Sequence, residues 1–366
     1  MAGDRGHVAA ALGHVRTVVA DRVDEAHERV ATVLGRAGVA ADPSALAAGA
    51  VAHPIGVNFH PDRLAGDGRL VARALLDDGI YRSQFVTGIS NGGLTAHPGG
   101  DRDRWEERLF GGAYRWSDAT PADRPVYGGL DLHARSDGPC PRFGSCHLRL
   151  RPHMAERATY CFGDSHTGPV DVGTADAFHL VLAALLEAAE RDGTVLGHPA
   201  DVAGLAALLA IEPLPVDPGA EPGRALDHYI EVQLHGLVDV GADAQALVAD
   251  PSLRGTESGQ LLEALADRHG LDLAWHRGFE LTAEEVPPEF RGPEVVALAR
   301  RVVADLGDGD PRIHAELVGR AARSVVTDPD RWADHAPPAA TLQHLKQLWH
   351  ALVHVGRPAA PGRLDG

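Results

Sequence analysis

The chain has 366 residues, enough for two ordinary domains or for one enlarged domain with added helices. Hydrophobic residues make up 44% and charged residues 23% of the chain, as in globular proteins, and no apolar run approaches the roughly 20 residues that span a bilayer. The formal net charge of −17 predicts an acidic surface that repels polyanions, which argues against general binding to nucleic acid or to anionic membranes.

Local composition refines these limits. The first 15 residues contain one acidic residue and two histidines where a signal peptide needs an apolar core, so a cytoplasmic location is expected. Cys140, Cys146 and Cys161 lack the Cys-x-x-Cys spacing of structural zinc sites and are expected to be buried or free thiols. Lys346 is the only lysine, so a small anionic ligand would be held by arginines.

In the first third of the chain, the sequence pattern predicts helices first and then two strands with a short helix between them. Apolar residues recur at helical spacing over residues 4–36, which indicates one or two helices. A strand is expected over 52–60 and a short helix, ended by glycine, over 66–79. The apolar run 80–85 carries one arginine and predicts a second strand.

The segment 87–113 is rich in Gly, Asn, Asp and Arg and predicts a long loop. Loops of this length inside a compact protein are often lids or binding segments. This one carries Trp105 and Phe110, and we expect both to be exposed and available for docking. The alternative is a solvated loop without a binding role.

The rest of the chain alternates between the two kinds of element. Strands are expected over 125–132, 145–150, 159–162, 229–235 and 271–276. Helices are expected over 175–191, 202–209, 242–248 and 258–269, and, with proline-rich breaks, over 293–355. The pattern predicts an α+β fold with an N-terminal helical segment at 1–50, an α+β core at 51–290 with a helical insertion at about 174–222, and a C-terminal helical segment at 291–366.

Three common nucleotide-binding and catalytic motifs are missing. Despite 42 glycines, neither a G-x-x-x-x-G-K-[ST] loop nor a G-x-G-x-x-G turn after a strand occurs. Residues 89–93, which include Asn91, offer a backbone nest for an anion, with a simple turn as the alternative. The stretch 163–165 lacks the flanking small residues of a G-x-S-x-G elbow, so serine hydrolysis is not expected.

The 21 histidines raise a metal alternative. Two short alternations and one further histidine offer mixed nitrogen and oxygen ligands. No H-E-x-x-H motif occurs among them. The alternative is a metal-dependent hydrolase whose ligands are His60, Asp62, Asp164, His166 and His235.

Arg82, Ser165 and Glu231 point to a different chemistry. Cleavage of an N-glycosidic bond passes through an oxocarbenium-like state that a nearby carboxylate stabilises. An arginine suits a diphosphate, and a serine at a strand end can position a ribose. Together these residues predict a site that cleaves NAD. The structural alternatives are an ion pair for Arg82, a turn for Ser165 and a surface position on an edge strand for Glu231.

Several stretches of the chain resemble the bacterial domain of unknown function 3626 family. They extend over about 50–290, and the family name implies no activity. The matching stretches are 58–63, 81–85 through 91–95, 124–128, 143–146, 162–166, 231–236 and 275–279.

At a greater distance, the order of segments is similar to that of mono-ADP-ribosyltransferases. The resemblance implies a split β-sandwich core with added N- and C-terminal helices, and NAD as co-substrate without a required metal. It implies that Arg82 binds the NAD phosphate or ribose, that Ser165 binds the nicotinamide ribose, and that Glu231 is the catalytic carboxylate. Tyr229 stands where arginine-modifying members carry a further glutamate, and 162–165 keeps only the last residue of the usual Ser-Thr-Ser motif.

The leading hypothesis is therefore an NAD-consuming ADP-ribosyltransferase or NAD glycohydrolase with a protein or small-molecule acceptor. The loop 87–113 is expected to cover NAD or to contact the acceptor. A non-catalytic interaction module that uses Trp105, Phe110 and the acidic surface is a further alternative. The expected catalytic residues are Glu231, Gln233 and Arg82, and the expected NAD-binding residues are Arg82, Ser83, Ser165, Asp164, Tyr81, Asn91 and Tyr127.

Overall fold

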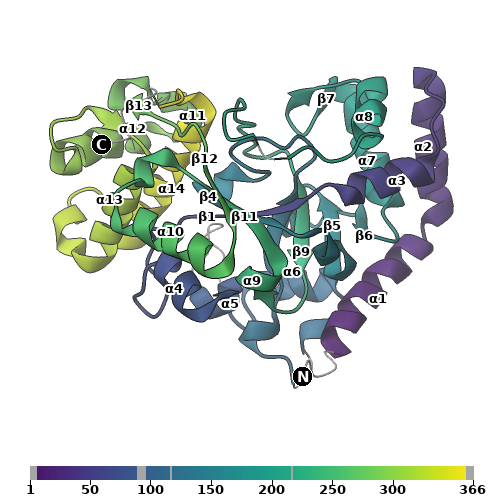
Figure 1. Cartoon of the computed structure of the whole chain (residues 1–366), viewed down its shortest axis with the longest axis horizontal. Helices are drawn as coiled ribbons and strands as arrows, with labels where there is room; N and C mark the ends of the chain where they lie inside the picture. The colour runs from purple at the N-terminus through teal and green to yellow at the C-terminus, as the bar shows by residue number, and fades with distance from the viewer. Residues whose placement is uncertain (1–5, 89–95, 116–117, 216, 360–366) are drawn as a thin grey trace.

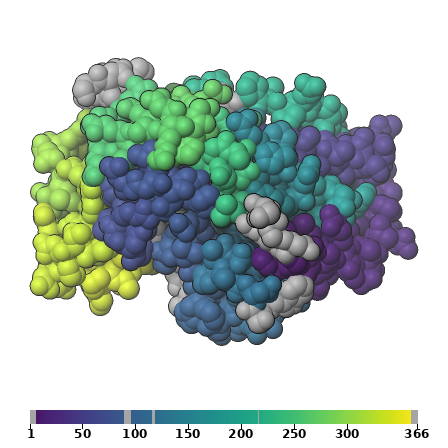
Figure 2. Space-filling view, turned by 60° about the horizontal axis from the view of Figure 1, so that its bottom comes forward, coloured from purple at the N-terminus to yellow at the C-terminus, as the bar shows by residue number. Residues whose placement is uncertain are grey.

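The computed structural model describes residues 6–88, 96–115, 118–215 and 217–359. A large β-sheet lies in the middle of the molecule, with N-terminal helices at one end and C-terminal helices at the other (Figure 1). Figure 2 shows the same two helical groups at opposite ends of the space-filling surface. The expected α+β class is confirmed.

The helices differ widely in length. None of the helices in the described residues is both long enough and apolar enough to cross a membrane. The helices are α1 (Gly6–Ala20), α2 (Val23–Ala37), α3 (Pro43–Ala52), α4 (Val71–Asp78), α5 (Gln84–Thr87), α6 (Asp101–Leu109), α7 (His179–Asp192), α8 (Val202–Leu209), α9 (Val240–Asp243), α10 (Glu257–His269), α11 (Pro288–Arg291), α12 (Pro293–Leu306), α13 (Ala315–Thr327) and α14 (Pro338–Val355).

The main sheet has eight strands in the order β12-β11-β4-β1-β3-β9-β5-β6. Neighbouring strands are antiparallel, except that β11 and β12 are parallel. Three two-stranded ribbons, β2–β10, β7–β8 and β13–β14, complete the described sheets. The strands are β1 (Ile55–Phe59), β2 (Ile80–Tyr81), β3 (Val126–Leu130), β4 (Cys146–Leu150), β5 (Ala158–Phe162), β6 (Val172–Thr174), β7 (Thr194–Val195), β8 (His198–Pro199), β9 (Ile230–Leu234), β10 (Val238–Asp239), β11 (Ala244–Ala249), β12 (Asp272–Trp275), β13 (Leu281–Thr282) and β14 (Arg312–Ile313).

Three sequence-based expectations about local structure are wrong. The run 242–248, expected to be helical, lies mostly in β11, because pairing with β4 and β12 outweighs the helix preference of its alanines. The strand expected over 80–85 ends at Tyr81, and α5 follows. The segment expected to be a long loop contains α6.

The exposed docking aromatics expected in that segment are also not found. Trp105 on α6 is 5% exposed, and Phe110, which follows the helix, is 1% exposed. Phe110 packs with Ala11 and Val15 of α1, so this part of the chain is an interior element. The interaction module based on these two aromatics therefore lacks its surface.

The two largest apolar clusters of the described residues form separate cores. Strands of the main sheet share the larger core with α7, whose Leu182 and Leu185 are fully buried beside residues such as Val232 of β9. A second core joins α12, α13 and α14 around Trp332 and Trp349. All three cysteines are buried and free, as expected.

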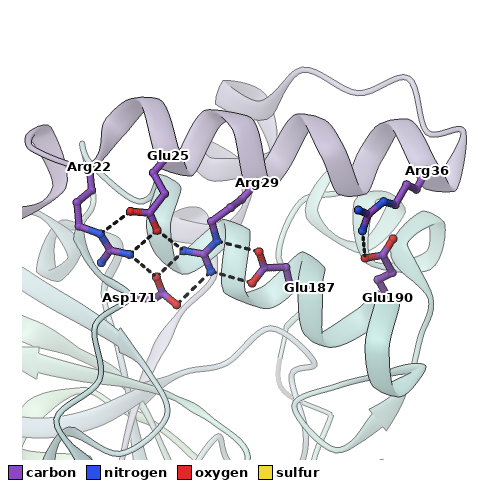
Figure 3. A network of polar contacts seen from close by, with 7 residues as sticks. All are labelled: Arg22, Glu25, Arg29, Arg36, Asp171, Glu187 and Glu190. Carbon is purple, nitrogen blue, oxygen red and sulfur yellow. Dashed lines mark hydrogen bonds and ion pairs between the residues drawn. The ribbon is translucent and has the colours of Figure 1, made fainter.

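Arg29 of α2 ties the N-terminal helices to this framework (Figure 3). Its guanidinium donates two hydrogen bonds of 2.8 Å to Glu187 of α7, and two of 2.7 and 3.2 Å to Asp171 beside β6. These bonds raise the pKa of Arg29 above its ordinary value. Arg36, about two helical turns further along α2, makes a single contact of 3.4 Å with Glu190 (Figure 3).

Replacing Arg29 by methionine keeps most of the side-chain volume and removes both paired contacts. We expect Arg29→Met to lower the free energy of unfolding by about 1–2 kcal/mol, since the pairs are bidentate and partly shielded from water. The matched change Arg36→Met should cost less than about 0.5 kcal/mol, because that side chain is 67% exposed. Urea unfolding measures both, and equal losses in the two variants would contradict the assigned role of Arg29.

Candidate functional site

A cavity of about 200 Å³ brings together the three residues on which the sequence hypothesis rests, Arg82, Ser165 and Glu231. Glu231, at 6% exposure, is a buried lining residue. Arg82 and His166 have side chains that are 40% and 45% exposed and mark the mouth. Four arginines, two carboxylates and several aromatic rings line the space between.

Glu231 reaches the cavity because β9 is a central strand. Its backbone pairs with Gly129 of β3 on one side and with Cys161 of β5 on the other. Successive side chains of a strand point to opposite faces, so the apolar residues of β9 face the core with α7 while Glu231 faces the cavity. The alternative of a surface position on an edge strand is therefore wrong.

Burial raises the pKa of Glu231 to about 7, and the nearby charge of Asp164 acts in the same direction. Hydrogen bonds from Ser165 and Gln233 oppose this shift. The Gln233 amide lies 2.8 Å from Oε1 of Glu231, and the backbone N–H of Ser165 lies 3.4 Å from Oε2. The carboxyl group thus changes its charge near neutral pH.

Gln233 begins a chain of buried hydrogen bonds behind Glu231. Its Oε1 lies 2.8 Å from the hydroxyl of Thr159, which is its cross-strand partner on β5. The same hydroxyl lies 2.9 Å from Nε2 of His235, and Nδ1 of His235 lies 2.5 Å from the hydroxyl of Tyr114. Gln233 is therefore not a lining residue of the cavity but a direct partner of Glu231.

The donors in this chain point in one direction when Glu231 is ionised. Gln233 presents its NH₂ group to the carboxylate, so its carbonyl oxygen accepts the single proton of Thr159. Thr159 must then accept from Nε2–H of His235, which leaves Nδ1 to accept from Tyr114. Burial lowers the pKa of His235 to about 3, so the ring is neutral and can hold these two opposite roles. We call this set, Tyr114–His235–Thr159–Gln233, the donor chain.

Asp164 and Ser165 enter the cavity from the turn after β5. Asp164 caps the 3₁₀ turn Ser165–Thr167 by accepting from the backbone N–H of His166. Its other carboxylate oxygen accepts a hydrogen bond of 2.7 Å from the hydroxyl of Tyr229. Burial acts to raise the pKa of Asp164, but the hydrogen bonds from His166 and Tyr229 outweigh it and the pKa is lowered.

The residues expected from the segment 81–83 line the cavity in different ways. Arg82 is not on a strand but directly after β2, where its Nε lies 3.1 Å from Asp78. Ser83 is buried and donates to the carbonyl of Pro121, so its hydroxyl is already engaged. Tyr81 lines the cavity beside Phe59.

Tyr127 and Asn91 are the two remaining residues that were expected to bind NAD. Tyr127 lines the cavity, and its hydroxyl donates to Glu106 over 2.7 Å. Asn91, with the proposed anion nest at 89–93, lies outside the described residues.

The sequence-based site leaves out several lining residues that have no local motif. Among them are Arg102 and Trp105, three residues apart on α6 and therefore on one helix face. A helical interpretation of 101–109 would have paired them. Thr159 and Tyr114 of the donor chain are also absent from the prediction, because they lie far from Glu231 in sequence.

The proposed metal site does not form. No three His, Cys, Asp or Glu side chains of the described residues come together in a way that could hold a metal ion. His60, Asp164 and His166 line the cavity but not as one ligand group, Asp62 is buried against Gly319 of α13, and His235 is held in the donor chain. The expectation that these five residues converge on one metal ion is therefore wrong for the described residues.

Comparison with known proteins assigns the chain to a family. A search of curated proteins returned no match to the chain. The family model described as "Protein of unknown function (DUF3626)" matches residues 54–355, from the residue before β1 to the last residue of α14. The match includes the strands of the main sheet, every lining residue of the cavity and the C-terminal helices, and leaves α1, α2 and α3 outside. The chain therefore belongs to the DUF3626 family.

Proposed function

We propose that the chain is an NAD-consuming ADP-ribosyltransferase or NAD glycohydrolase that cleaves the nicotinamide N-glycosidic bond with Glu231 as its single catalytic carboxylate. The observation that carries the proposal is the meeting of Arg82, Ser165 and Glu231, separated by up to 149 positions in sequence, around one cavity. Residues that lie this far apart share a cavity only if the fold brings them there.

The chemistry of the cavity fits the requirements of that reaction. The departure of nicotinamide leaves positive charge on the ribose, and an ionised carboxylate next to the breaking bond stabilises it. The donor chain supports the ionised form of Glu231 through Gln233. Ser165, next to Glu231, is placed to orient a ribose hydroxyl, and Tyr81 and Tyr127 offer aromatic surface to a planar ring.

The proposal extends to the fold and to the partners. The glutamate strand β9 lies between β3 and β5, and Ser165 follows β5, an order that suits an ADP-ribosyltransferase-like core with added terminal helices, although the eight strands form one continuous sheet and not a split β-sandwich. NAD is the proposed co-substrate, without a required metal. The acceptor is a protein or small molecule, or water in the glycohydrolase reaction.

The direct test is release of nicotinamide from NAD by purified protein. Glu231→Gln keeps the side-chain volume and still accepts a hydrogen bond from Gln233, so we expect the release rate to fall by about 10²–10³-fold with little loss of stability. Chromatography of the products measures nicotinamide, and labelled NAD with cell lysate shows whether ADP-ribose is transferred.

Asp131→Asn is a matched control for this variant. Asp131 is also buried, and burial raises its pKa to about 7, but it lies outside the cavity. Nicotinamide release should be unchanged in Asp131→Asn. An equal rate in wild type and Glu231→Gln would remove Glu231 from the mechanism.

A second prediction concerns pH. The ionised form of Glu231 is the active one, so nicotinamide release should rise with pH through a midpoint of about 7. The folded-state pKa lies above the ordinary value of 4.5, so the stabilisation from the bound proton is present below about pH 4.5 and is lost as pH rises through 7. The unfolding free energy of the wild type should therefore fall by about 2–4 kcal/mol relative to Glu231→Gln over that interval. A release rate that is flat between pH 6 and 8 contradicts the assignment.

A third prediction isolates the donor chain. Thr159→Val removes the hydroxyl that links Gln233 to His235, so the ionised form of Glu231 loses support and its pKa rises further. We expect the midpoint of the pH–rate curve to move upward by roughly half a unit to one unit.

Thr174→Val is the control for this shift. Thr174 is also a buried strand threonine and pairs directly with Thr159, but its hydroxyl donates to Asp176, away from Glu231. The midpoint should stay in place in that variant. A shift of the same size in both variants would mean that general loosening of the sheet, and not the donor chain, sets the midpoint.

A further inference from the structure

The four arginines that line the cavity differ in what they bind. Three of them donate at least one hydrogen bond to an acceptor of the protein. These are Arg63 with the carbonyl of Val318, Arg82 with Asp78, and Arg142 with Asp227. The fourth, Arg102, forms no hydrogen bond and no ion pair with any described residue.

Arg102 is nevertheless deeply buried, at 6% exposure. Its guanidinium carbon lies 4.5 Å from the ring centroid of Trp105 and 4.5 Å from that of Tyr127. Such contacts use the flat faces of the guanidinium and the rings, and leave the N–H groups at the guanidinium edge without a partner. The Nε atom is among the buried polar atoms of the described residues that have no acceptor.

Nearby carboxylates do not supply that acceptor. The acidic groups of α6 pair with other arginines, Asp103 and Glu106 with Arg124, and Glu107 with Arg115. Glu106, one helical turn from Arg102, has each of its oxygens engaged, one by Arg124 at 2.9 Å and one by the hydroxyl of Tyr127 at 2.7 Å. Its charge reaches Arg102 only at longer range.

A buried cation without a hydrogen-bonded partner is unfavourable unless a ligand supplies the anion. We infer that Arg102 is the phosphate-binding residue of the cavity and that its ligand is a diphosphate group. The planar guanidinium, fixed between two rings, matches the paired oxygens of a phosphate and loses little freedom on binding. The role that the sequence suggested for Arg82 is thus assigned to a residue on α6.

The position of Arg102 suits a nucleotide whose glycosidic bond lies at Glu231, and in this form the inference rests on the proposed function. Arg102 lies over Tyr127 of β3, and Glu231 pairs with Gly129, two residues along the same strand. The two β3 positions that these groups adjoin, Tyr127 and Gly129, are roughly 7 Å apart along the strand. That spacing is comparable with the length of a pentose.

The test measures binding of defined compounds by calorimetry and does not depend on catalysis. The full chain is titrated with inorganic pyrophosphate, with ADP-ribose and with adenosine, which has no phosphate. Arg102→Gln should weaken the binding of pyrophosphate and of ADP-ribose by about tenfold or more. Arg102→Lys keeps the charge without the paired donors and should fall between Arg102→Gln and the wild type.

Arg104→Gln is the matched control, because Arg104 lies two residues along α6, is mostly exposed and pairs with Asp101. It should bind all compounds as the wild type does, and adenosine should bind to none appreciably. Thermal unfolding shows whether each variant is folded, and Arg102→Lys carries the test if Arg102→Gln is not.

The outcomes separate this inference from the proposed function. Phosphate binding that depends on Arg102, in a protein that does not release nicotinamide, supports the phosphate site and contradicts the NAD reaction. Equal binding by Arg102→Gln and the wild type overturns the inference, as does failure of the wild type to bind either phosphate compound.

Discussion

The alternation of side chains along β9 is the constraint on which the site depends. Ile230, Val232 and Leu234 are fully buried in the core shared with α7, and this fixes the register of the strand. Because the period of a strand is two, Glu231 and Gln233 must then face the other side. A slip by one residue would bury the acid in the apolar core and expose the aliphatic residues to the cavity. The packing of one face therefore holds the chemistry of the other in place.

The surroundings shift the pKa values of two carboxyl groups in one cavity in opposite directions. Asp164 has direct hydrogen bonds from His166 and Tyr229, and its pKa is lowered. Glu231 is more deeply enclosed and lies near the charge of Asp164, so its pKa is raised to about 7. Environments that push neighbouring pKa values apart are typical of sites that divide acid, base and electrostatic roles between similar residues. Here the ionised Asp164 stays fixed while Glu231 responds to pH and to its donors.

The sequence predicted the strands around the cavity well, because their signals are local. β3, β4 and β9 fall within the expected runs, and β5 starts one residue before its expected run. The helix α6 was mistaken for a loop because it has few apolar residues. Its charged residues are instead satisfied by Arg124 and Arg115 from later in the chain, a compensation that local sequence does not show.

The partners of the site were harder to predict for the same reason. Thr159 meets Gln233 only through the pairing of β5 with β9, and Tyr114 meets His235 only because the turn after α6 folds over the sheet. Arg102 gives no signal beyond its type until the acids near it are seen to be engaged elsewhere. Residue types and spacing thus identified the carboxylate of the site, whereas the groups that tune it follow from tertiary contacts.

The C-terminal helices take part in the architecture of the cavity through Trp349 of α14. Its indole N–H donates to the carbonyl of Pro141 over 2.7 Å, and its ring lies edge-on to His60, 5.2 Å between centroids. His60 and Arg142, the residue after Pro141, both line the cavity. One wall of the cavity is therefore supported by Trp349 of α14, which lies almost 120 residues after Glu231 in the sequence. A shortened chain that ends after the main sheet would keep Glu231 and its strand yet lose the shape of the space around them.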